Sequence, residues 1–171
     1  MGIVGPPDRR ERTEKAILYP HESKYADEGF EQVTLQWLYE YAWQNDGVVL
    51  YGHTKGASRR DYSTVGWRTV MINQVVRHWE RNLLLLEDHD AVGCHWLTVH
   101  QYAGMIANSP IFGGNFWMAT TGYIRRLQAI GLDGRYRAEE WIGLADPCVV
   151  DLFPGWPGAY DKPQNQRAIY G

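Results

Sequence analysis

The chain has 171 residues, of which 44% are hydrophobic and 22% charged, and its net charge is −3. These values indicate one globular domain with its own core, and no apolar run approaches the roughly 18 residues of a membrane-spanning helix. The absence of a basic block argues against a nucleic-acid partner. The first ten residues lack an apolar signal segment, which favours a cytoplasmic location.

Strands alternate with helices along the predicted chain. Apolar runs predict strands at residues 2–5, 16–19, 48–51, 91–96, 116–119 and 149–153. Helical spacing predicts helices at residues 34–44, 63–86, 123–130 and 138–144. This order is typical of a three-layer α/β domain with a mixed, mostly parallel sheet. We expect one domain over residues 1–153 and a loosely ordered tail over residues 154–171.

Ligands of such sheets bind beyond the carboxyl ends of the strands, which points to the loops after Tyr51, Trp96 and Ala119. The first of these loops carries His53, Thr54, Lys55 and Gly56. A lysine with exposed backbone N–H groups at a strand end can bind phosphate oxygens. The spacing differs from that of a P-loop, and a solvated turn is the alternative.

Two further patterns suggest metal binding. Asp88 and Asp90 flank His89 in an Asp-x-Asp arrangement that can hold a divalent ion, although they follow a helix and could be its solvated end. His89, His95 and His100 match no zinc spacing. A metal-dependent hydrolase built on these aspartates and histidines is therefore kept as one functional class. The two cysteines, in apolar stretches, are predicted to be free thiols.

The segment Gly114, Asn115, Phe116 and Trp117 combines a flexible glycine, an amide that donates and accepts, and an aromatic face. It suits a sugar or a base, and the alternative is a tight turn before a strand.

The segment Glu139, Glu140 and Trp141 begins a short predicted helix close to Arg135 and Arg137. The two acids could simply stabilise the helix start. A carboxylate near arginine can also stay ionised and act as a general base.

Five segments together resemble one family. VVLYGHTKG, GWRTVM, DAVGC, GNFWMATTGYIRRL and RYRAEEWIG occur in this order between residues 30 and 153. They are similar to segments of small bacterial and viral glycosyltransferases with a GT-A-like, Rossmann-like fold. The resemblance implies transfer of a sugar from a nucleotide-sugar donor to a hydroxyl acceptor on a polysaccharide, a protein or a modified nucleobase.

The resemblance also assigns roles to residues. His53, Thr54, Lys55, Gly56 and Arg68 would hold the donor diphosphate, because the first three occupy the place of the family's Asp-x-Asp. Cationic side chains would then replace a manganese or magnesium ion, and a metal at Asp88 and Asp90 is the weaker alternative.

On the acceptor side, the resemblance makes Glu139 the catalytic base. Residues 114–117 and Trp141 would form the acceptor or sugar pocket. Such enzymes also carry a strand and helix upstream of the segment that begins at Gly2, so we expect either that the donor half is shortened in this chain or that the donor is bound differently. The competing hypothesis is a glycosyltransferase-like binding or scaffold protein without catalysis.

Overall fold

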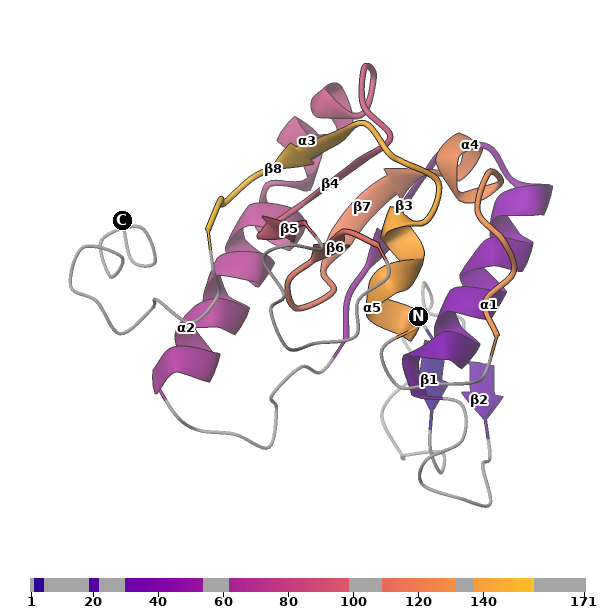
Figure 1. Cartoon of the computed structure of the whole chain (residues 1–171), viewed down its shortest axis with the longest axis horizontal. Helices are drawn as coiled ribbons and strands as arrows, with labels where there is room; N and C mark the ends of the chain where they lie inside the picture. The colour runs from indigo at the N-terminus through magenta and orange to yellow at the C-terminus, as the bar shows by residue number, and fades with distance from the viewer. Residues whose placement is uncertain are drawn as a thin grey trace.

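The computed structural model describes residues 2–4, 19–21, 30–53, 62–98, 109–131 and 137–155 (Figure 1). The helices and helical turns are α1 (Phe30–Gln44), α2 (Tyr62–Met71), the π-helical turn η1 (Ile72–Arg77), α3 (Trp79–Leu85), α4 (Thr121–Ile124), α5 (Arg137–Glu140) and the 3-10 turn η3 (Trp141–Gly143). The strands are β1 (Gly2–Val4), β2 (Tyr19–His21), β3 (Val48–Tyr51), β4 (Ala91–Gly93), β5 (Trp96–Leu97), β6 (Ile111–Phe112), β7 (Trp117–Thr120) and β8 (Val149–Asp151). None of the described helices is long and apolar enough to cross a membrane.

The main sheet is mixed, in the order β3-β7-β4-β8. Strand β7 runs antiparallel to both β3 and β4, and β8 runs parallel to β4. Strands β3, β4 and β8 therefore point in one direction, and β7 runs opposite to them between β3 and β4. Two of the three pairings are antiparallel. The expected α/β class with a mixed sheet is confirmed. A mostly parallel sheet was also expected. Three of the four strands do share one direction, but only the β4–β8 pairing is parallel.

Helices pack against both faces of this sheet (Figure 1). Trp117 and Ala119 of β7, with Ala91 of β4, contribute to a core shared with α1, α4, α5 and η3. Met118 and Val92 point the opposite way, into a core shared with α2 and η1. This alternation follows from the two-residue period of a strand, and it lets one sheet support two apolar cores.

Helix α1 begins at Phe30, earlier than the predicted start at residue 34. The longer helix places Glu31 in its first turn, where a carboxylate is stabilised by the positive end of the helix dipole. It also buries Gln32 and Val33. This change in the helix start determines which acidic residue reaches the site described below.

The helix predicted over residues 63–86 is divided into α2, η1 and α3. The wider π-helical turn interrupts the regular backbone hydrogen bonds. The buried Asn82 compensates, because its Nδ2 donates to the carbonyl oxygens of Gln74 at 2.9 Å and Val75 at 3.2 Å. Apolar spacing alone could not reveal this inserted turn.

The strand predicted at 91–96 is also divided, into β4 and β5. His95 between them has a positive φ of 58°. The Asp151 carboxylate stabilises this bend, since it accepts from the backbone N–H groups of His95, Trp96 and Phe153. Strand β5 then pairs with β6, which was not predicted.

The last part of the chain agrees with prediction in element type. The helix expected at 123–130 is reduced to α4, and the one expected at 138–144 is α5 followed by η3.

Near the beginning of the chain, the strand expected at 16–19 corresponds to β2 at Tyr19–His21, which pairs in parallel with β1. Of the predicted tail, residues 156–171 lie outside the described residues.

Candidate functional site

Two of the predicted motifs meet at one end of the main sheet. Tyr51, the last residue of β3, pairs with Trp117, the first residue of β7. The residues after β3 and those before β7 therefore lie at the same end. His53 Nε2 donates to the Gly114 carbonyl oxygen at 2.9 Å. The loop after β7 lies at the opposite end, so the prediction that placed a ligand loop after Ala119 is wrong for this site.

Glu31 joins this end of the sheet from the first turn of α1, and the sequence motifs did not include it. Its Oε2 accepts from the Tyr51 hydroxyl at 3.1 Å and from Asn115 Nδ2 at 2.7 Å. Its Oε1 lies 3.3 Å from His53 Nδ1. The side chains of Glu31 and His53 are 27% and 17% exposed, so an incoming ligand can reach both. We call Glu31, Tyr51, His53 and Asn115 the Glu31 cluster.

The His53 ring has an oxygen acceptor at each nitrogen. One is the Glu31 carboxylate and the other is the Gly114 carbonyl. Only the imidazolium form can donate at both positions, since neutral imidazole has a single N–H. Both ring nitrogens of His53 are therefore directed at oxygen atoms of the protein, one at Glu31 and one at Gly114.

Asn115 connects three parts of the chain from a fully buried position. Its Nδ2 donates to Glu31 Oε2 and to the Ala138 carbonyl at 3.3 Å, and its Oδ1 accepts from Trp117 Nε1 at 2.8 Å. Its backbone φ of 54° is a conformation that asparagine adopts more readily than most residues. Every hydrogen-bonding group of the amide is therefore used inside the protein.

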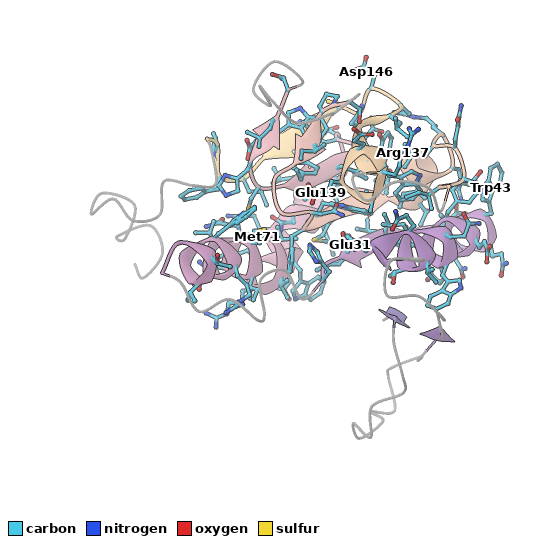
Figure 2. The ribbon with its side chains drawn as sticks, turned by 60° about the horizontal axis from the view of Figure 1, so that its bottom comes forward. Glu31, Trp43, Met71, Arg137, Glu139 and Asp146 are labelled. Carbon is cyan, nitrogen blue, oxygen red and sulfur yellow. The ribbon has the colours of Figure 1, made fainter. Side chains whose placement is uncertain are left out.

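Glu139 lies on α5, one residue after the carbonyl that Asn115 contacts. Figure 2 shows Glu31 at one end of α1 with Glu139 beside it, whereas Trp43 lies at the other end of this helix. Burial raises the pKa of the Tyr51 hydroxyl far above its usual range, and the Glu31 and Glu139 carboxylates raise it further. Tyr51 therefore stays a hydrogen-bond donor, and Glu139 lies close enough to influence it.

The two neighbouring acids of α5 have different surroundings. Glu139 is partly exposed, whereas Glu140 is 3% exposed. A general base must be within reach of its substrate, so this difference favours Glu139 over Glu140 for the role of base.

Residues 5–139 match the model of a family described as a domain of unknown function, DUF8361. The chain belongs to this family. The DUF8361 match spans Glu31, His53, Asn115 and Glu139, so the whole arrangement lies inside the family's domain. Comparisons with curated proteins and with solved structures gave no match.

The aromatic residues of the predicted pocket lie in the hydrophobic core of the protein. Trp117 and Trp141 are 0% and 1% exposed, and Phe116 is 6% exposed. Trp117 stacks on Tyr51 with ring centroids 5.0 Å apart, and Trp141 Nε1 donates to the Gln128 carbonyl. The prediction that these rings line a sugar pocket is corrected, because the protein itself covers their faces.

Gly114 has a structural reason to be glycine. Its φ is +91°, and a Cβ built there would lie 2.5 Å from Met71 Sδ and 2.9 Å from Trp67 Cζ2. Trp67 Nε1 also donates to the neighbouring Gly113 carbonyl at 3.3 Å. The space beside Gly114 is therefore occupied by side chains of helix α2.

The aspartates of the predicted metal site lie elsewhere. Asp90 precedes β4 at the other end of the sheet, where its Oδ2 accepts from Arg126 at 2.9 Å and from the Cys148 backbone N–H. His89 Nδ1 donates to the Leu85 carbonyl, and Asp88 is exposed. Across the described ranges, no three His, Cys, Asp or Glu side chains are grouped to hold a metal ion. Asp90 therefore forms a structural ion pair with Arg126.

The remaining donor-side residues are only partly described. Arg68 lies in the last turn of α2 and is partly buried. Thr54, Lys55 and Gly56 lie outside the described residues, as does Arg135. Their predicted roles stay predictions.

Proposed function

We propose that this protein transfers a sugar from a nucleotide-sugar to a hydroxyl acceptor, with the Glu31 cluster and Glu139 forming the reaction site. The observation that carries the proposal is that a partly exposed Glu139 lies beside Glu31, whose carboxylate contacts His53 just after the carboxyl end of β3 (Figure 2). The mixed sheet with helices on both faces also supports a GT-A-like, three-layer domain, as the five sequence motifs imply.

The reaction requires one base and a way to offset the charge of the leaving diphosphate. In a single displacement, the acceptor oxygen attacks the anomeric carbon while Glu139 takes its proton. The bond from that carbon to the diphosphate oxygen breaks, and the electron pair leaves with the nucleotide. A protonated His53 would add positive charge at this end of the sheet, and Lys55, two residues along the chain, is the candidate direct contact to the diphosphate.

Ligand binding gives the first test. A nucleotide-sugar at about 100 times its Kd adds roughly 2.7 kcal/mol of stability, which for a domain of this size raises the Tm by roughly 5–10 °C. We expect a thermal-shift screen to show such a rise with a nucleoside diphosphate sugar and a smaller rise with the matching nucleoside monophosphate.

The matched variants are His53→Ala, which removes an imidazole from the site, and His89→Ala, which removes one at the other end of the sheet. His53→Ala should reduce the shift, and His89→Ala should preserve it. If no nucleotide or nucleotide-sugar stabilises the wild type, the transferase proposal fails and the binding or scaffold hypothesis replaces it.

Metal removal gives an independent test. We expect transfer to continue in excess EDTA, because the resemblance places His53 and Lys55 where related enzymes carry Asp-x-Asp. Transfer would be followed by release of the nucleoside diphosphate before and after chelation. Loss of all transfer, with recovery on adding manganese or magnesium, would assign a divalent ion to the reaction and contradict this prediction.

A further inference from the structure

The segments that carry the two carboxylates of the site are far apart in sequence and share one buried connection. Glu31 belongs to α1, and Glu139 belongs to the four-residue helix α5. Asn115 donates one N–H to the Glu31 carboxylate and the other to the Ala138 carbonyl, next to Glu139. A single planar amide therefore fixes the distance between the start of α1 and the start of α5.

The amide itself is held firmly. Its oxygen accepts from the indole of Trp117, which is fully buried in the central strand β7. The Asn115 backbone N–H donates to the Phe112 carbonyl at 2.9 Å. Since Asn115 is also fully buried and all of its side-chain groups have partners, it does not contact a ligand in this arrangement.

We propose that Asn115 is a positioning residue that sets the placement of Glu139 relative to Glu31 and His53. This assignment replaces the ligand contact that the sequence suggested for Asn115. The kinetic part of its test rests on the proposed transferase function. A base displaced by about 1 Å can lose roughly a hundredfold in rate, which is the size of effect that a positioning residue controls.

The chain offers a matched control in Asn82. It is also fully buried, and its Nδ2 also donates to two oxygens, the carbonyls of Gln74 and Val75. These lie in η1, which packs on the other face of the sheet. Asn115→Asp and Asn82→Asp therefore remove the same kind of donation from two separate places.

We expect Asn115→Asp to lower kcat by about a hundredfold, with little change in KM for the donor, because the new carboxylate faces Glu31 and cannot donate to Ala138. Asn82→Asp should lower thermal stability and leave kcat nearly unchanged. If both variants lower kcat equally, or neither does, Asn115 has only a structural role and the proposal is overturned. If Asn115→Asp does not fold, Asn115→Gly replaces it, because glycine suits the positive φ and adds no charge.

A second readout separates this proposal from the proposed function. The side-chain carboxyl carbon signals of Glu31 and Glu139 can be followed by NMR and assigned with Glu31→Gln and Glu139→Gln. We expect the Asn115 variant to move both signals and the Asn82 variant to move neither. If the wild type transfers no sugar, the transferase proposal fails, and these signals alone decide whether Asn115 positions Glu139. An unmoved Glu139 signal would overturn the positioning role.

Discussion

Replacing Glu139 with glutamine should reduce sugar transfer by a factor of about 10²–10⁴, the usual contribution of a positioned general base. Glutamine has nearly the same shape but cannot take the acceptor proton. Glu139 is partly exposed on α5, so the substitution leaves the packing of the neighbouring core unchanged. Turnover would be measured as nucleoside diphosphate release at saturating donor and acceptor.

The control for this variant is Glu80→Gln, which removes an exposed carboxylate from α3. We expect it to keep wild-type turnover. The Glu139→Gln protein should also keep the wild-type Tm and the ligand-induced shift, because donor binding does not use the base. Undiminished turnover in Glu139→Gln would remove this residue from the mechanism.

Replacing Gly143 with alanine should destabilise the protein by about 3 kcal/mol or more, at the upper end of the cost of overpacking a core. Gly143 is buried at the end of η3, and an added Cβ would overlap the Pro110 carbonyl oxygen. A backbone oxygen cannot move aside by changing rotamer, so η3 and the segment before β6 must separate. The expected fall in Tm is at least roughly 6–12 °C for a chain of this size.

Gly122→Ala provides the comparison. A Cβ at Gly122 would meet its nearest atoms, Thr120 Oγ1 and Arg125 Nη2, at the ordinary distances of 3.9 and 4.0 Å. Alanine also favours a helix over glycine by up to about 1 kcal/mol, so α4 should be unaffected or stabilised. Equal melting temperatures for Gly143→Ala and the wild type would contradict the close contact between η3 and Pro110.

Several elements could be predicted because they depend on short apolar runs. Strand β3 at Val48–Tyr51 has the predicted bounds, and β7 differs by one residue. The direction of β7 was not predictable, because an isolated strand sequence carries no information about its neighbours. The π-helical turn was also missed, since its stabilisation comes from Asn82, several residues further along the chain.

The candidate site shows a similar division. His53, Gly114 and Glu139 were found from local patterns, and the structure brings them to one end of the sheet. Glu31 was missed because the predicted helix started too late to include it. Trp117 and Trp141 were given ligand roles because their residue type suits sugars, whereas burial depends on tertiary packing that composition does not report.

The two strands that carry the site differ in how easily they can open. Strand β7 is hydrogen-bonded on both sides, whereas β3 pairs only with β7 among the described residues. Local opening costs more in a strand with two neighbours than in one with a single neighbour. The residues next to β7, including Asn115, are thus the more rigid side of the site. If the backbone moves when a ligand binds, we expect the movement mainly in the segment after β3 that carries His53.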